Sequence, residues 1–304
     1  MVLAATPKMC LIHNPRAGRG KAPAAARRLL AALAAAGLAP EVLTTQGRGH
    51  AEELARRAVA RGVETVLVVG GDGTVHEAAQ ALAHSPAALA PLPAGRCNDF
   101  CRALGLGPDP EALVAALAGG GRRVVDLARV NGRVYCTVAA VGFDAEVSRY
   151  VDLMKAPLWG QPAYLYAVLR MLGRYRPPQV SLVWDDGEYH GPLFLAAVGN
   201  TPSYGNNIRI TPQAKADDGL LDICLVRPAG MLRVLRLLPS VLQGKHGGVD
   251  EVSFVRTSKV RITCDRPMEL WADGEPVTGS PLRVEVLPRA LRVVVPPAPG
   301  AAPA

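Results

Sequence analysis

A glycine-rich string with one carboxylate and one hydroxyl, Gly70-Gly71-Asp72-Gly73-Thr74, directly follows the apolar run at residues 65–69. Glycines let backbone N–H groups approach a phosphate closely, and the positive end of a following helix favours an anion. Asp72 cannot bind a phosphate directly, but it can hold a magnesium-bound water or orient the loop. We therefore interpret residues 70–74 as a nucleotide-phosphate loop.

The same string also has a structural interpretation. Thr74 and Glu77 have the Thr-x-x-Glu spacing of a helix capping box. Because a cap and a phosphate loop are compatible, we predict both roles for Thr74 and a structural role for Glu77. The spacing matches neither the Walker A sequence nor the Rossmann glycine pattern, so the string alone indicates only that phosphate can bind there.

Two further turns lead from apolar runs into helices, and the cations of the first could meet a polyphosphate. The first, Asn14-Pro15-Arg16-Ala17-Gly18-Arg19-Gly20-Lys21, is rich in glycine and cations, although solvated turn charges would look the same. The second, residues 93–102, leads into a helix, and either Asn98 or Asp99 is expected as its N-cap. In a parallel sheet such turns lie at the carboxyl ends of the strands, where ligands bind.

Three acidic turns follow in the second half of the chain. The string Asp217-Asp218-Gly219-Leu220-Leu221-Asp222 is either a turn before a strand or a cation site, and it lacks the ligand spacing of an EF-hand. The tripeptide Asp-Gly-Glu occurs twice, at residues 186–188 and 273–275, both times between apolar runs. Because Asp-Gly is a favoured hairpin turn, only position can separate a catalytic copy from a structural one.

The elements around these residues change character near residue 124. Before it, short apolar runs alternate with helical patterns, which predicts a mostly parallel, doubly wound sheet. After it, Asn131-Gly132 indicates a two-residue hairpin. Later runs are β-type, among them single strands at 252–263, 282–287 and 291–295, except for helical patterns at 160–172 and 231–242. We predict an α/β nucleotide-binding domain at 1–124, an antiparallel β-sandwich domain at 125–295 and a disordered tail at 296–304.

Composition narrows the class of protein. Apolar residues make up 49% of the chain, and the net charge of +8 suits an anionic partner as well as a simple arginine bias. The basic residues are scattered and aromatic residues reach only 5%, which argues against nucleic acid as a partner. Without a CxxC pair, a signal sequence or an apolar span, we expect a cytoplasmic protein that meets a membrane only from outside.

Taken together and in order, these strings resemble the diacylglycerol kinase catalytic family, and especially its bacterial soluble lipid kinases. The likeness runs from Cys10 to about Val295. Besides the three strand-to-helix turns, it includes Val141-Gly142-Phe143-Asp144, Gly199-Asn200, residues 212–221 and Asp273-Gly274-Glu275. Any one of these strings is common, whereas the ordered set is highly specific.

The resemblance implies a two-domain fold in which ATP and a lipid meet. It implies transfer of the γ-phosphoryl group of ATP to a lipid hydroxyl with Mg²⁺, which needs charge neutralisation and a carboxylate to accept the hydroxyl proton. The nucleotide site that it implies consists of Asn14, Thr44, Gly70, Gly71, Asp72, Gly73, Thr74, Arg96 and Asn98.

The resemblance also assigns the acidic turns. Glu275, with Asp273 beside it, is expected to supply the proton acceptor, and the copy at 186–188 remains a hairpin. The resemblance also implies a structural magnesium ion, held by the backbone carbonyls of Lys215 and Leu220 and the side chain of Asp218. The expected partner is a lipid substrate at the membrane surface, with peripheral association, and a homodimer is compatible with the sequence.

The chain departs from the family pattern at two positions, and two alternatives stay open. Ala17 stands where Ser or Thr is usual, and Arg96 stands where the family has Thr, so a cation replaces a hydroxyl. A nucleotide- or lipid-binding module without catalysis is therefore one alternative. The other is an NAD kinase, which shares the Gly-Gly-Asp-Gly-Thr loop, although Asn98-Asp99-Phe100 and the late Asp-Gly turns favour the lipid kinase.

Overall fold

The computed structural model describes residues 9–153 and 161–296, and the chain divides into two compact units. One unit comprises Met1–Leu127 and Pro288–Ala304, and the other comprises Ala128–Leu287. Two strands, β5 (Arg122–Val130) and β16 (Leu282–Val294), contribute residues to both. The sequence-based assignment gave all residues from 125 to 295 to the second domain and did not foresee the return of the chain after residue 287.

The first unit is a parallel sheet with the strand order β2-β1-β3-β4-β16. The carboxyl-terminal part of β16 joins this sheet, because Arg292 and Val293 pair in parallel with Ala88 and Leu89 of β4. Strand β3 is buried along its whole length, as its uninterrupted apolar run predicted. The other strands are β1 (Met9–His13), β2 (Glu41–Thr44), β3 (Thr65–Gly70) and β4 (Ala88–Pro93).

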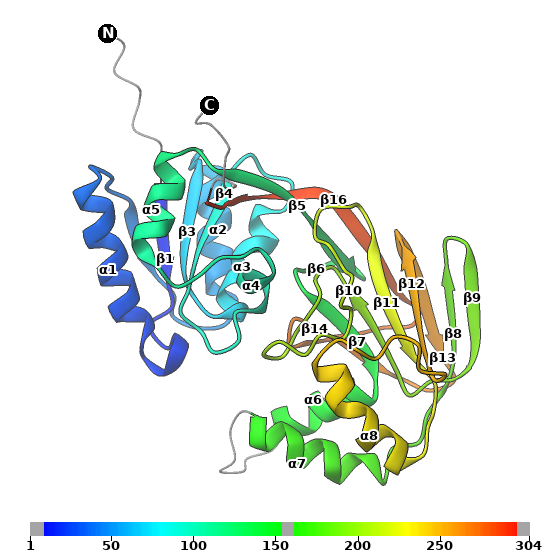
Figure 1. Cartoon of the computed structure of the whole chain (residues 1–304). Helices are drawn as coiled ribbons and strands as arrows, with labels where there is room; N and C mark the ends of the chain where they lie inside the picture. The colour runs from blue at the N-terminus through cyan, green and yellow to red at the C-terminus, as the bar shows by residue number, and fades with distance from the viewer. Residues whose placement is uncertain (1–8, 154–160, 297–304) are drawn as a thin grey trace. The chain divides into compact units, whose positions relative to one another are not determined.

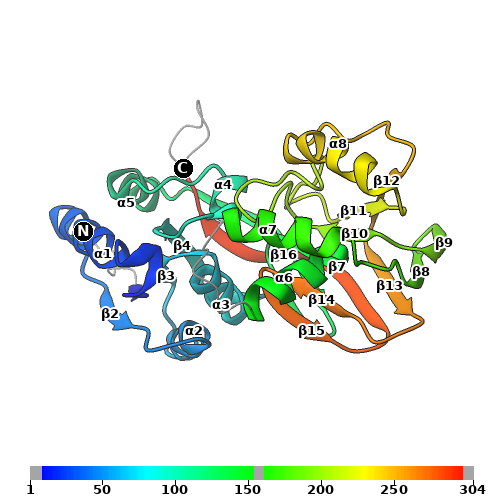
Figure 2. The same cartoon turned by 90° about the horizontal axis from the view of Figure 1, so that it is seen from below.

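Helices cover both faces of this sheet (Figures 1 and 2). Helix α1 (Ala22–Ala35) and α5 (Pro110–Ala118) pack on one face, and α2 (His50–Ala60) and α3 (Asp72–Leu82) pack on the other. Two short helices, η1 (Ala17–Arg19) and α4 (Asp99–Ala103), follow β1 and β4. The predicted doubly wound α/β architecture is confirmed.

The second unit consists of two antiparallel sheets that enclose a common core. The first has the order β12-β11-β10-β7-β14-β15; the second contains β16-β13-β8-β9, with β5 beside β16 and β6 beside β5. Val141 and Val198 of one sheet and Leu182 and Ile262 of the other lie in that core, so the β-sandwich is confirmed. The bounds are β6 (Arg133–Tyr135), β7 (Val138–Gly142), β8 (Gln179–Trp184), β9 (Gly187–Pro192), β10 (Leu195–Gly199), β11 (Leu221–Val226), β12 (Val252–Thr257), β13 (Lys259–Cys264), β14 (Glu269–Ala272) and β15 (Glu275–Thr278).

Turns decide several details of this sandwich. Asn131 and Gly132 have φ values of 46° and 89°, the left-handed pair of a type I′ turn, and they join β5 to β6 as predicted. The apolar run at 252–263, expected as one strand, is divided at Ser258 into β12 and β13, which belong to different sheets. The runs at 282–287 and 291–295 are instead parts of the single strand β16.

Three helices cover the outer face of the six-stranded sheet, as Figures 1 and 2 show: α6 (Phe143–Leu153), α7 (Gln161–Leu172) and α8 (Met231–Leu242). Val147 of α6, Val168 of α7 and Leu195 of β10 form a second core, against which Leu235 of α8 packs. Among the described helices, none has the length and apolarity that crossing a membrane requires. The predicted tail lies outside the described residues from 297 onward.

Candidate functional site

Three turns of the first unit, those after β1, β3 and β4, are joined by direct contacts. The Asn14 N–H donates to the Val69 carbonyl at 3.0 Å, and the Ala94 N–H donates to the Gly70 carbonyl at 2.7 Å. These bonds continue the parallel ladders into the turns. The three turns predicted to meet at the carboxyl edge of the sheet therefore do meet there.

Glycines are required where the turns approach each other. A Cβ added to Gly95 would lie 2.4 Å from the Gly71 Cα, and a Cβ on Gly70 would lie 2.6 Å from the Thr74 Cβ. A Cβ on Gly18, which has φ 61°, would lie 2.0 Å from the Ala94 carbonyl oxygen. A side chain at position 95 or 18 would push two turns apart, and one at position 70 would displace Thr74 within its own turn, so the glycines have a structural reason independent of a ligand.

Asp72 links the second turn to the third. Its Oδ2 accepts the Asn98 N–H and its Oδ1 accepts the Asp99 N–H, both at 2.7 Å. The carboxylate thus satisfies N–H groups at the start of α4, where charge and helix polarity agree. Asn98, with φ 54°, closes its own turn by accepting the Gly95 N–H at 3.0 Å. Of the two roles considered for Asp72, these contacts correspond to orienting the loop.

Two side-chain pairs connect the remaining predicted nucleotide residues. The Asn14 Nδ2 donates to the Thr74 Oγ1 at 3.1 Å, and Thr74 is buried. The exposed Thr44 lies at the end of β2, where its Oγ1 is 2.8 Å from the His13 Nε2. Burial lowers the pKa of His13, so the neutral imidazole is favoured. His13 had no signal in the sequence, because only the parallel pairing of β1 and β2 brings it to Thr44.

The predicted capping box is wrong. The N-cap of α3 is Gly71, and Thr74 lies inside the first helical turn. Glu77 does not reach back along its own helix; its carboxylate accepts the N–H groups of Gly49 and Ala51 at 2.8 and 3.0 Å. Glu77 therefore caps the neighbouring helix α2, whose first N–H groups lack partners within the helix. A structural role was expected for Glu77, but at a different helix.

Cations surround the three turns without being part of their framework. Arg16, Arg19, Lys21 and Arg96 are exposed. Arg102 is engaged, because its guanidinium donates to the buried Asp99 carboxylate at 2.7 Å. The first unit thus brings the predicted nucleotide residues of the three turns together, and Thr44 joins them through His13.

In the second unit, the turn of the β14–β15 hairpin is anchored through Asp273. Asp273 and Gly274 have φ values of 48° and 80° and form a two-residue turn between the paired residues Ala272 and Glu275. The Asp273 Oδ2 accepts the Cys136 N–H at 2.6 Å, and Oδ1 accepts the Thr137 N–H at 2.9 Å together with the Thr137 hydroxyl. The carboxylate therefore ties the hairpin to the connection between β6 and β7.

Glu275 begins β15 and forms an ion pair with Arg133 of β6. Only 16% of its side chain is exposed. The ion pair orients the carboxylate, and the neighbouring Asp273 fixes the strand on which it lies. On the same strand as Arg133, Tyr135 is fully buried and its hydroxyl donates to the Val198 carbonyl at 3.1 Å. Burial, together with the charge of Asp273, raises the pKa of this hydroxyl well above its usual range.

The turn predicted to hold a metal ion contains oxygen donors and one competing cation. The Asp218 Oδ1 accepts the Leu220 N–H at 3.1 Å, while its Oδ2 pairs with the Arg256 guanidinium. The buried Asp222 has its Oδ2 3.6 Å from the Arg256 Nε and without a hydrogen-bond partner among the described residues. Burial raises the pKa of Asp222. An orphaned carboxylate oxygen beside Asp218 fits a hard cation, with Arg256 competing for it.

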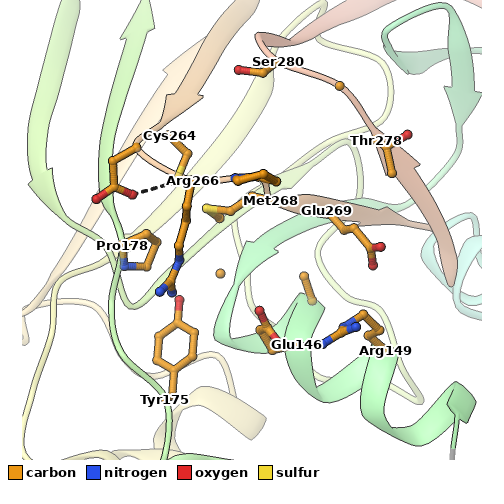
Figure 3. Close-up of a pocket in the computed structure, with 15 residues that line it drawn as sticks. Glu146, Arg149, Tyr175, Pro178, Cys264, Arg266, Met268, Glu269, Thr278 and Ser280 are labelled. Atoms are coloured by element: carbon orange, nitrogen blue, oxygen red, sulfur yellow. Dashed lines mark hydrogen bonds and ion pairs between the residues drawn. The ribbon is translucent and has the colours of Figure 1, made fainter.

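A cavity of about 720 Å³ lies at the other end of the β14–β15 hairpin (Figure 3). Its walls include Glu146 and Arg149 of α6, Arg266 extending toward Tyr175, and Glu269 of β14. Glu269 starts β14, so it lies about 13 Å along the strand from the Asp273 turn. None of the predicted site residues lines this cavity, and nothing in the sequence indicated it.

Two family models match the chain, one for each half. Residues 8–130 match the diacylglycerol kinase catalytic domain, and residues 137–295 match the YegS C-terminal NAD kinase beta sandwich-like domain. A solved structure described as a putative diacylglycerol kinase from Bacillus anthracis str. Sterne has a TM-score of 0.80 and 24% identity. It covers 97% of this chain and 99% of that one. This likeness supports the two-unit fold.

Curated relatives extend the match to sequence. A "Diacylglycerol kinase" of Mycobacterium tuberculosis is 36% identical over 95% of both chains. A "Probable lipid kinase YegS-like" protein of Pseudomonas aeruginosa is 33% identical over 95% of this chain and 94% of its own. These matches define the chain as a kinase. It belongs to the bacterial lipid kinase family of diacylglycerol kinases and YegS-like proteins, which confirms the resemblance seen in the sequence.

Proposed function

We propose that the protein transfers the γ-phosphoryl group of ATP to the hydroxyl of a lipid alcohol, diacylglycerol or a close relative. The observation that supports this most strongly is the set of three joined turns in the first unit. Within the second unit, an oriented glutamate on the β14–β15 hairpin supports it separately. The names of the relatives, "Diacylglycerol kinase" and "Probable lipid kinase YegS-like", favour this reaction over the phosphorylation of NAD.

The three turns are suited to hold the nucleotide. The start of α3 presents N–H groups among them, and a Cβ on Gly73 would meet no protein atom within 4 Å, which leaves room for a phosphate beside the backbone. Asp72 is engaged with the third turn, so we assign it the positioning of that turn. We assign to the exposed Arg96, where the family has Thr, a charge contact with the phosphates.

On the hairpin, we assign the proton acceptor to Glu275 rather than Asp273. Both oxygens of Asp273 already accept hydrogen bonds from the N–H or O–H groups of residues 136 and 137. Loss of these hydrogen bonds would detach the β14–β15 turn from the connection between β6 and β7. Glu275 is oriented by Arg133 and is mostly buried. We therefore propose that Glu275 accepts the proton of the attacking lipid hydroxyl, while Asp273 holds the hairpin in place.

We propose that Mg²⁺ is held by the Asp218 carboxylate with the carbonyl groups of Lys215 and Leu220. We assign the ion a structural role: when bound, it would offset the negative charge of Asp218 and of the neighbouring Asp222 and stabilise this turn. Arg256 pairs with the same carboxylate and holds the turn in place. Titration of protein with Mg²⁺ is expected to raise its melting temperature, and the Asp218→Asn variant is expected to lose this response; an equal response from both would contradict the assignment.

The test of the reaction is incubation of the purified protein with Mg²⁺, γ-labelled ATP and a panel of lipid alcohols including diacylglycerol. We expect label in a lipid product. Label in NADP when NAD is added, with none in any lipid, would favour the NAD kinase. ATP binding without label in any acceptor would favour the non-catalytic module.

A matched pair of variants tests the assignment of the nucleotide to the turn at residues 70–74. Gly73→Ala adds a methyl group to the phosphate loop, and Gly107→Ala adds one at another position where a Cβ meets nothing within 4 Å. We expect Gly73→Ala to raise the KM for ATP by about tenfold or more, because the methyl group occupies space needed by a phosphate. Gly107→Ala should leave it unchanged. Equal effects would contradict the placement of the nucleotide.

A further inference from the structure

Exposed apolar side chains gather on three helices of the second unit. Eight large hydrophobic residues are exposed in the described part of the chain, and all but Val42 and Val183 lie on α6, α7 and α8. The remaining six form a group that we call the helical face: Leu153, Tyr166, Leu169, Met231, Leu232 and Leu242. Figure 1 shows the three helices together on one side of their sheet. Such a concentration of apolar surface marks an interaction site.

Helix α8 shows the feature most clearly. Its sequence MLRVLRLLPSVL is largely apolar, yet none of its residues is buried. Leu235 and Val241 turn inward and pack on the core beneath, while Leu232 on the outer side is 67% exposed. Twelve residues of helix are about 18 Å long, too short to cross a bilayer but sufficient to lie along its surface.

The charged residues of α7 and α8, which carry five of the six residues of the helical face, have one sign, whereas α6 contains Asp144, Glu146 and Asp152. Residues 161–184 and 223–249, which contain α7 and α8 with their flanks, include no Asp or Glu. Exposed cations stand among the apolar residues, at Arg170, Arg174, Arg236 and Lys245. Arg233 is the exception, because it pairs with Glu251 outside these segments. The combination of apolar and basic side chains on α7 and α8 fits an anionic lipid headgroup layer.

We propose that the helical face docks on an anionic bilayer, with its apolar side chains entering the interface and its cations meeting lipid phosphates. The proposal rests on the proposed function, since a lipid acceptor is reached at a bilayer. A second copy of the chain is a poorer occupant, because a symmetric contact would place Arg170 and Arg236 against other cations.

Vesicle co-sedimentation tests the proposal with unilamellar vesicles of phosphatidylcholine, alone or mixed with phosphatidylglycerol. Leu232→Glu is compared with Val183→Glu, a control that adds the same charge at an exposed apolar position on β8. We expect the wild type to bind the mixed vesicles, more weakly as salt is raised, and Leu232→Glu to bind about tenfold less tightly or worse. Val183→Glu should bind as the wild type does.

Charge is tested separately. Arg236→Glu should weaken binding to the mixed vesicles, whereas Arg261→Glu, at an exposed position on β13, should not. Equal binding to neutral and mixed vesicles would overturn the proposal, and so would unchanged binding by Leu232→Glu. A dimer that Leu232→Glu dissociates in analytical ultracentrifugation, without an effect on vesicles, would identify a second copy as the occupant and overturn it as well.

Two readouts separate docking from catalysis and from folding. Leu232→Glu should keep the wild-type melting temperature and phosphorylate a short-chain, water-soluble acceptor at the wild-type rate. Should it unfold instead, Leu169→Glu on α7 provides the same test. Vesicle binding by a protein that labels no lipid would contradict the proposed function and support docking, whereas lipid labelling without any vesicle binding would contradict docking alone.

Discussion

The second unit contains two β-hairpins with the tripeptide Asp-Gly-Glu at their turns, β8–β9 with Asp186-Gly187-Glu188 and β14–β15 with Asp273-Gly274-Glu275. In β8–β9, Trp184 pairs with Gly187, so Asp185 and Asp186 form the turn. In β14–β15, Ala272 pairs with Glu275, so the Asp and Gly of the tripeptide form it. The tripeptides therefore differ in register by one residue.

The carboxylate that anchors each turn also differs by one position relative to the tripeptide. At β8–β9 the anchor is Asp185, whose Oδ2 accepts the Ser258 N–H at 2.7 Å and the Ser258 and Thr257 hydroxyls. At β14–β15 the anchor is Asp273, the first residue of the tripeptide. Each anchor accepts a backbone N–H and hydroxyl groups from another connection of the unit. The two hairpins use the same chemistry to hold their turns.

The glutamates have different environments as a result. Glu188 follows its anchor by three residues, is 62% exposed and pairs with His190 at the surface. Glu275 follows its anchor by two residues, is 16% exposed and pairs with Arg133. Because side chains alternate along a strand, a shift of one residue moves a side chain to the other face. Turn register, rather than the tripeptide, decides which glutamate is held in an oriented position.

The largest expected effect is a difference in kcat between variants of the two glutamates. Glu275→Gln should lower kcat for lipid phosphorylation by about 10²–10⁴-fold, because an amide cannot accept the hydroxyl proton. Glu188→Gln should leave kcat unchanged. Initial rates with saturating ATP and lipid measure both. If the two variants lost activity equally, the distinction between the hairpins would be wrong.

Replacing the anchor Asp273 should destabilise the protein more than replacing Asp186, which is not an anchor. Asp273→Ala should lower the free energy of unfolding by about 2–4 kcal/mol, because three donors at residues 136 and 137 lose their acceptor. Asp186→Ala, at the corresponding tripeptide position, should change it by less than about 0.5 kcal/mol. Urea unfolding of the two variants provides the comparison, and a cost at Asp186 as large as that at Asp273 would argue against the anchoring difference.

Glycine has a different function in the two tripeptides. Gly274 has φ 80° with open space around it, so Gly274→Ala should destabilise by about 1 kcal/mol and Gly274→Asn by less. Gly187 does not have a positive φ; a Cβ there would lie 2.8 Å from the Trp184 ring. Asn should therefore give no relief relative to Ala at position 187. Urea unfolding of the four variants checks this, and equal Asn rescue at both positions would contradict it.

The smallest expected effect is a pH dependence at the β8–β9 anchor. Hydrogen bonds from Ser258 and Thr257 lower the pKa of Asp185 to about 2 from its ordinary value of 3.8. A lowered carboxyl pKa contributes stability that is present above the unfolded value and is lost as the pH falls toward 2. The difference in urea midpoint between wild type and Asp185→Asn should therefore shrink from pH 5 to pH 2. A constant difference would show that titration of Asp185 contributes nothing.

Local patterns predicted much of the fold. The all-apolar run of β3, the type I′ pair Asn131-Gly132 and the helices α7 and α8 were evident because each depends on its own residues. Helix α6 was missed, since it directly follows the buried strand β7 and no turn signal separates the two elements. The division of β12 from β13 was also missed, because only the change of sheet at Ser258 separates them.

For the candidate site, the proximity of its turns could be predicted from the sequence, whereas the contacts between them could not. The glycine-rich turns could be placed together from strand order alone, as parallel strands end at one edge. That Asp72 would bind the Asn98 and Asp99 N–H groups could not be predicted, because the bond joins residues 26 and 27 positions apart. The capping prediction for Glu77 was wrong for the same reason. Local spacing suggested that Glu77 caps its own helix, whereas packing places its carboxylate at the start of α2.

The central claim is that Glu275 acts in the chemical step and not in nucleotide binding. Single-turnover transfer from γ-labelled ATP to diacylglycerol, with ATP affinity titrated on the same preparations, tests it most directly. We predict that Glu275→Gln keeps the ATP Kd within about twofold of wild type while its transfer rate falls by about 100-fold or more. Transfer at the wild-type rate, or a loss of ATP affinity that accounts for the slower turnover, would contradict the claim.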